Sequence, residues 1–137
     1  MKLIKVVFSA TLLCLSIAAR ADEATTGSHG GQLKHAGKYH LELVVKETAL
    51  TVYVIGDKDA KVATKGASGS ATVLAGKGTS NIKLEPSGEN ALAGSGSFQP
   101  APDMKVVVSL TLPGESPIQA RFTPTDTSKS SSKVPSK

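Results

Sequence analysis

Three histidines and one glutamate are the side chains of this sequence that are best suited to bind a metal ion. His29, His35 and His40 lie within a twelve-residue stretch, and Glu42 follows two residues later. Imidazole nitrogens bind Zn(II), Cu(II), Ni(II) and Co(II), and carboxylate oxygens often complete such sites. The four side chains therefore predict a site for one divalent transition-metal ion, whose identity the sequence leaves open.

The alternation of residue types around His40 indicates how two of these side chains are positioned. Apolar residues occupy every second position from Tyr39 to Val45, as in a strand with one buried face. His40 and Glu42 therefore point together to the face away from the core, where they would form the fixed half of the site. The alternatives are that the histidines are solvated side chains on a polar arm and an exposed strand face, or that His40 and Glu42 are a hydrogen-bonded surface pair.

A polar, glycine-rich segment, residues 22–37, precedes this strand. Gly30 and Gly31 directly follow His29 and permit a sharp turn of the backbone. We expect the segment to be a flexible arm that brings His29 to the strand, with His35 as an optional fourth donor. Metal binding requires neutral imidazole, so the affinity would fall as the pH drops through about 6.5.

Patterns of catalytic residues are absent from the sequence. It contains no Gly-x-Ser-x-Gly elbow and no pair of carboxylates that can be placed across a cleft. Asp57 and Asp59 fall in a Gly-Asp-Lys-Asp turn without the further oxygen ligands that calcium requires. We therefore expect a binding protein and not an enzyme.

Short apolar runs separated by Gly and Pro predict the architecture. The expected strands are Tyr39–Lys46, Leu50–Ile55, Ala71–Ala75, Thr79–Glu85, Asn90–Ser97, Met104–Leu112 and Ile118–Thr123. No helical periodicity of useful length follows residue 21. About seven short strands in one small domain, residues 38–123, predict an all-β fold, an antiparallel immunoglobulin-like β-sandwich.

Residues 1–21 are typical of a signal peptide. A positively charged start precedes the mostly apolar run Val6–Ala19, and Ala19-Arg20-Ala21 has the small-x-small pattern of a cleavage site. We expect cleavage before Asp22, which removes the only cysteine, Cys14. The mature protein would then be periplasmic, would have no membrane attachment, and would depend on an ordinary hydrophobic core because it has no disulfide.

The charge of the expected mature chain is small. The whole sequence has 16 basic and 11 acidic residues, a net charge of +5, and loss of Lys2, Lys5 and Arg20 leaves 13 basic residues and +2. This spread-out charge gives no footprint for nucleic acid. Residues 124–137 are rich in Ser, Lys and Pro and are expected to be a disordered tail.

Several short pieces of the chain together have a familiar pattern. They are His29-Gly30-Gly31-Gln32, Gly37-Lys38-Tyr39-His40-Leu41-Glu42-Leu43-Val44, the strand Leu50–Ile55 with Gly56-Asp57, Gly69–Leu74, Val106–Gly114 and Gln119–Phe122. The pattern resembles, over about residues 29–123, the His-Gly-Gly-bearing N-terminal module of CzcB-type periplasmic adaptor subunits of metal-efflux pumps, and free-standing periplasmic proteins of the same build.

This resemblance implies a periplasmic protein that handles divalent heavy metals. The positions that match its signature are His29, Gly30, Gly31, His40 and Glu42, whereas His35 lies outside it. The chain lacks the helical hairpin and the lipoyl-like half of an adaptor, so the bridging function of adaptors is not carried over.

Two functions follow as expectations. The first is a metal-binding accessory protein, a carrier or buffer, that is associated with heavy-metal efflux and resistance and has a periplasmic efflux component as a partner. The second is a β-sandwich interaction module of the cell envelope that binds a protein partner through a sheet edge or the arm and uses no metal.

Overall fold

The computed structural model describes residues 25–124, in which the regular secondary structure is β-strand apart from one short 3-10 turn. The elements are β1 (Thr25–Thr26), β2 (Gln32–Ala36), β3 (Tyr39–Lys46), β4 (Ala49–Ile55), a 3-10 turn η1 (Asp57–Asp59), β5 (Ser68–Ala75), β6 (Gly78–Pro86), β7 (Ala91–Ser95), β8 (Lys105–Thr111) and β9 (Ile118–Phe122). The predicted signal peptide and nearly all of the predicted tail lie outside the described residues. Within residues 25–124, no helix has the length and apolar composition needed to cross a bilayer.

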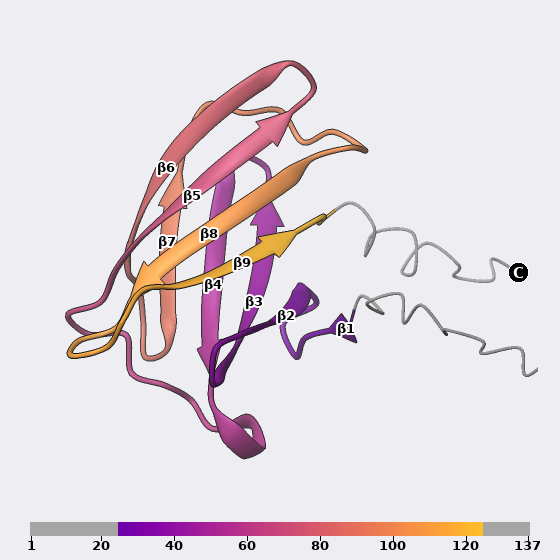
Figure 1. Cartoon of the computed structure of the whole chain (residues 1–137). Coiled ribbons are helices and arrows are strands. Elements are labelled where there is room, and N and C mark those ends of the chain that lie inside the picture. The colour runs from indigo at the N-terminus through magenta and orange to yellow at the C-terminus, as the bar shows by residue number, and fades with distance from the viewer. Residues whose placement is uncertain (1–24, 125–137) are drawn as a thin grey trace, which may run out of the picture.

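The strands are arranged in the order β1-β2-β3-β4-β7-β6-β5-β8-β9, with antiparallel pairing throughout. Strands β5 to β8 form a Greek key, because β8 returns to lie beside β5 after the hairpin-connected β5, β6 and β7. The sheet curls into a half-barrel in which β5, β6 and β8 run diagonally across β3, β4 and β7 (Figure 1). The prediction of an all-β, antiparallel fold is confirmed, with nine strands instead of about seven.

The two additional strands, β1 and β2, lie in the segment that was predicted to be a flexible arm. Residues 25–36 form β1, a tight turn and β2, and β2 pairs with β3 along its whole length. The β domain therefore begins before residue 38. The inward face of β2 carries Gln32, Lys34 and Ala36, and this row lacks the large apolar side chains by which a strand is recognised.

Aliphatic side chains from both halves of the sheet fill the concave side. Burial alternates residue by residue along β4 and β8, as expected for strands with one face in the core. The largest fully buried apolar side chains are Phe122, Leu41, Leu43, Leu50, Ile82, Leu84, Leu92, Met104 and Leu110. Each contributes about 1.5–3 kcal/mol through removal from water, so this core is the main source of stability.

The sheet turns a corner between β6 and β7. These strands pair at only two positions, Glu85 with Ala93 and Pro86 with Leu92, and then separate. Beyond them, a Cβ atom at Gly94 would lie 2.2 Å from the Lys83 carbonyl oxygen. Gly94 is therefore needed because the backbone of β6 passes directly over this part of β7.

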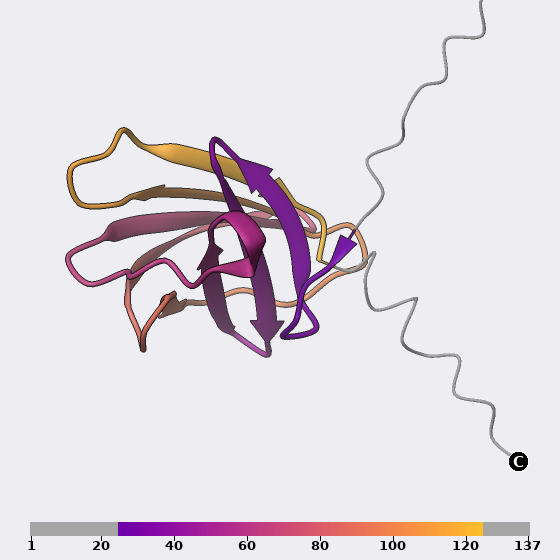
Figure 2. The ribbon, with the colours of Figure 1, turned by 90° about the horizontal axis from the view of Figure 1, so that it is seen from below.

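The opposite side of the half-barrel has a seam, where β2 lies beside β9 without being its neighbour in the order of paired strands. Seen from below in Figure 2, β2 lies across the gap between the β3–β4 pair and the β8–β9 hairpin. The buried carboxamide of Gln32 joins the two strands: its Oε1 accepts a 2.7 Å hydrogen bond from the Thr123 backbone N–H, and its Nε2 lies 3.4 Å from Thr123 Oγ1.

A second contact closes the far end of the seam. The Tyr39 hydroxyl donates a 2.6 Å hydrogen bond to Glu115 Oε1, and the Lys38 ammonium lies 3.0 Å from the same oxygen. Lys38 lies in the β2–β3 turn and Tyr39 is the first residue of β3, whereas Glu115 lies in the turn between β8 and β9. The contact therefore ties the two hairpins together across the seam.

This contact predicts a dependence of stability on pH. The hydrogen bond from Tyr39, and then that from Lys38, hold the pKa of Glu115 below its ordinary value of 4.5. A carboxyl whose pKa is lowered by folding stabilises the protein above pH 4.5, and this contribution is lost as the pH falls through the lowered folded-state pKa. Glu115 also raises the pKa of Lys38 and of Tyr39, so stabilisation by the contact is lost again when the pH rises through those raised values.

We therefore expect Glu115→Gln to lower the Tm at pH 7 and to have a much smaller effect at an acid pH below the lowered pKa of Glu115, where the wild-type carboxyl is protonated as well. Thermal unfolding of both proteins, followed by circular dichroism at the two pH values, measures this difference. An equal difference at both pH values would mean that the charge of Glu115 does not contribute.

Candidate functional site

Glu42 lies on the outer face of β3, as its place in the strand predicted, but no part of it is exposed. The turn between β1 and β2 covers it. A Cβ atom at Gly27 would lie 2.1 Å from the Glu42 carboxyl carbon, so the backbone of the turn lies directly on the carboxylate. The expectation of a solvent-facing Glu42 is corrected here, and the cause is the docking of the segment that was predicted to be mobile.

Three donors from this turn satisfy the buried carboxylate. Its Oε1 accepts hydrogen bonds from the backbone N–H groups of His29, at 2.7 Å, and Gly31, at 3.0 Å. Its Oε2 lies 2.9 Å from His29 Nδ1. A buried carboxylate is costly unless it is paired and hydrogen-bonded, and here both oxygens are engaged. Glu42 thus anchors the turn to the sheet.

The same contact fixes the ring of His29. An ionised carboxylate only accepts hydrogen bonds, so Nδ1 of His29 must carry the proton. The ring also stacks on Tyr53, with the centroids 3.6 Å apart and the planes 2° apart, and 40% of the His29 side chain is exposed. This is the arrangement in which a carboxylate orients a histidine so that Nε2 can bind a metal ion.

His35 and His40 form a separate pair on the same outer face. They lie directly opposite one another on β2 and β3, and their Nε2 atoms are 3.1 Å apart. The ring centroids are 3.9 Å apart, with the planes tilted by 50°. His35 is exposed and His40 is partly exposed, so both can be reached from solvent.

A signal for this pair was present in the sequence. Gly37 and Lys38 form the two-residue turn of the β2–β3 hairpin, and Gly37 has φ +61°, which glycine adopts without strain. Residues at equal distances from a two-residue turn face each other, so a turn at Gly37 places His35 opposite His40. The signal was missed because residues 22–37 were assigned to an arm.

The structure thus brings the four predicted donors together as two pairs, His29 with Glu42 and His35 with His40. It does not unite His40 and Glu42 as one half of a single centre. Within residues 25–124, no group of three or more His, Cys, Asp or Glu side chains is arranged to hold a metal ion.

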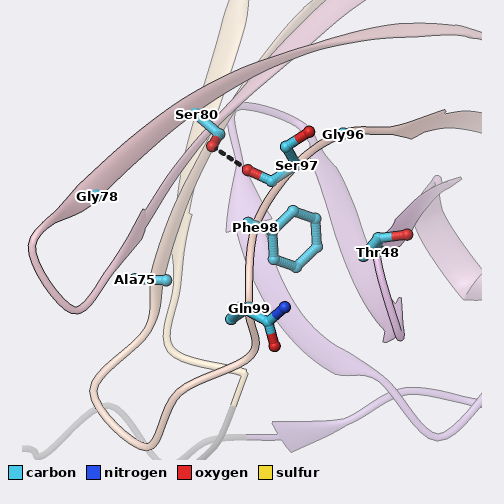
Figure 3. A pocket seen from close by; sticks show the side chains of 8 residues that line it. All are labelled: Thr48, Ala75, Gly78, Ser80, Gly96, Ser97, Phe98 and Gln99. Carbon is cyan, nitrogen blue, oxygen red and sulfur yellow. Dashed lines mark hydrogen bonds between the residues drawn. The ribbon is translucent and has the colours of Figure 1, made fainter.

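The described part of the chain also has two hollows, of which only the first lies beside one of these pairs. One, of about 320 Å³, lies beside His29 and is lined in addition by Thr26, Gly27, Ser28, Leu33, Ile55, Asp59, Lys61 and Asn90. The other, of about 690 Å³, lies at the end of the half-barrel, where Phe98 and a hydrogen bond of 2.6 Å from Ser80 Oγ to the Ser97 carbonyl form part of its wall (Figure 3). The residues that line this second hollow carry no ionisable side chain, so it offers no acid, base or charged ligand group.

Comparisons with known proteins add no relationship to this geometry: no protein-family model, no curated protein sequence and no solved structure matches the chain.

Proposed function

We propose that this protein is a periplasmic accessory protein that binds a divalent transition-metal ion as a carrier or buffer in heavy-metal efflux. The observation that carries the proposal is the 3.1 Å separation of the Nε2 atoms of His35 and His40 on an accessible face. The signal segment and the resemblance to CzcB-type modules support the compartment and the link to efflux. The proposal leaves the identity of the ion open and includes no enzymatic reaction.

The distance suits a chelate. Zinc binds imidazole nitrogen at about 2.0–2.1 Å, and a tetrahedral angle then places two such nitrogens about 3.3–3.4 Å apart. The two nitrogens therefore have to separate by only a few tenths of an ångström, and the rings, whose centroids are 3.9 Å apart, have to turn outward so that both lone pairs point to the ion. Without metal, one Nε2 must carry a proton and the other must accept it, so binding of the ion replaces a hydrogen bond between the two rings.

His29 has a supporting part in this proposal. Glu42 holds its Nδ1–H, which leaves the Nε2 lone pair available on a partly exposed ring. His29 is thus a candidate for a second, single-ligand position, and Glu42 is an orienting group instead of a direct ligand, because hydrogen bonds engage both of its oxygens.

An NMR titration of the mature chain with Zn(II) tests this function. We expect saturable shifts of the imidazole resonances of His35 and His40, and loss of saturable binding in His40→Ala. Cu(II) should broaden resonances around the same pair first. Weak, non-saturable shifts of all three histidines, or binding that is unchanged in His40→Ala, would contradict the proposal.

The alternative function is a protein-interaction module that uses no metal. The observation in its favour is that β1 and β9 are the outermost strands in the order of paired strands, the position at which an added strand can pair. Capture of a specific partner from periplasmic extract in the presence of a chelator, unaffected by His35→Ala, would favour this alternative.

We also propose that the fold is an immunoglobulin-like sandwich. The Greek-key connection and the two halves of the sheet that face each other across the core support it. A continuous strand order through β6 supports a half-barrel instead.

A further inference from the structure

The His35–His40 pair supplies only part of a coordination sphere. Zn(II) in proteins is almost always held by four ligands in structural sites and by three in catalytic sites. The pair provides two nitrogens, and the described residues provide no third donor arranged to join them. The remaining positions must therefore be filled from outside this pair.

The nearest candidate ligands in the sequence, Glu42 and His29, already make other contacts. Hydrogen bonds donated by His29 and Gly31 hold the carboxylate of Glu42, which is fully buried beneath the turn. The ring of His29 is fixed on Glu42 and Tyr53. Neither side chain can reach the His35–His40 pair without undocking the turn, which would leave the carboxylate of Glu42 without its donors.

The surroundings of the pair suit contact with another protein surface. Leu33, on β2, and Ile55, opposite His40 on β4, are partly exposed apolar side chains that line the hollow beside His29. The charged groups of this hollow are Asp59 and Lys61, one of each sign, and the ammonium of Lys61 also lies 3.4 Å from Glu89 Oε2. In a two-fold arrangement each copy offers the other the same surface, so an acid and a base allow complementary pairing and no single charge accumulates.

We propose that one Zn(II) ion joins two copies of this chain through their His35–His40 pairs, which gives four imidazole ligands in a tetrahedral arrangement. The proposal rests on the proposed function, since it requires that the pair binds metal. It adds the partner, which is a second copy of the chain, and the stoichiometry, which is one ion for two chains. A site shared in this way releases its ion when the copies separate, as a carrier or buffer requires.

A Zn(II) titration of the mature chain, residues 22–137, tests the proposal with two measurements on the same samples. Sedimentation velocity should show the monomer converting to a dimer, and NMR shifts of His35 and His40 should reach their end point near half an equivalent of Zn(II). EDTA should restore the monomer. His35→Ala should abolish the dimer, whereas Lys46→Ala, an exposed change near the end of the same β3 strand, should leave it unchanged.

The other outcomes separate the two proposals. Saturation at one equivalent of Zn(II) with a monomer throughout would overturn the shared site but leave metal binding by the pair intact. Absence of saturable binding would overturn both. A Zn(II)-dependent dimer that persists in folded His35→Ala would also overturn the shared site, because the ligands would then lie elsewhere.

Discussion

Glu42→Ala is expected to lower the free energy of unfolding by about 3–5 kcal/mol, because it removes a buried charge whose three donors remain in place. The backbone N–H groups of His29 and Gly31 would lose their acceptor, and the imidazole of His29 would lose its partner. For a domain of this size the loss corresponds to a fall in Tm of roughly 15–25 °C. Thermal and urea-induced unfolding, followed by circular dichroism, measure it.

Glu42→Gln provides the matched control. Both backbone N–H groups bond to Oε1, so an amide oxygen at that position keeps these two hydrogen bonds, and the loss of stability should be well below that of Glu42→Ala. The amide NH₂ group would face Nδ1 of His29, which then has to accept, and the proton moves to Nε2. The imidazole ¹⁵N shifts of His29 should report this change of tautomer. Equal, small losses in both variants would show that Glu42 does not anchor the turn.

Gly94→Ala is expected to cost about 3 kcal/mol, at the upper end of the range for inserting a methyl group into a well-packed site. The new Cβ would lie 2.2 Å from the Lys83 carbonyl oxygen and 2.8 Å from Ile82 Cγ2. One of these neighbours is backbone, so β6 and β7 would have to separate at the corner of the half-barrel. Denaturant unfolding measures the loss.

Gly78→Ala is the control for this substitution. Gly78 begins β6, and a methyl group added there would have the Ala75 carbonyl oxygen as its nearest neighbour, at 3.6 Å, which is an ordinary contact. The change should be neutral or slightly stabilising, because alanine reduces the conformational freedom of the unfolded chain. If Gly94→Ala were equally harmless, the close passage of β6 over β7 would be wrong.

Much of the fold followed from the alternation of residue types. The run from Tyr39 to Lys46 matched β3 residue for residue, and the runs for β4, β8 and β9 differed by a residue or two at their ends. The order of the strands could not be predicted in this way, because local sequence patterns do not specify that β4 pairs with β7. The alternation of residue types also does not indicate the corner between β6 and β7, which Gly94 permits.

The candidate site was predicted as a set of residues but not as an arrangement. The approach of His29 to Glu42 was expected from the Gly30–Gly31 pair, and the structure contains it. The burial of Glu42 was not expected, because burial depends on where the preceding turn docks and not on the strand that carries the residue. The His35–His40 pair depends on the register of one hairpin, which a turn at Gly37 fixes.

The seam between β2 and β9 has a consequence for the order in which the chain folds. The hydrogen bond from Thr123 to Gln32 joins residues that are 91 positions apart, whereas the hairpins on either side of it form from neighbouring segments. Closing so long a loop costs more conformational entropy than closing a hairpin, and the Gln32 carboxamide together with the partly exposed Glu115 contact returns little of it. The seam should therefore be the last part of the molecule to form and the first to open. The backbone amide of Thr123 should exchange its hydrogen through this local opening, well before the amides of β4 and β8 do.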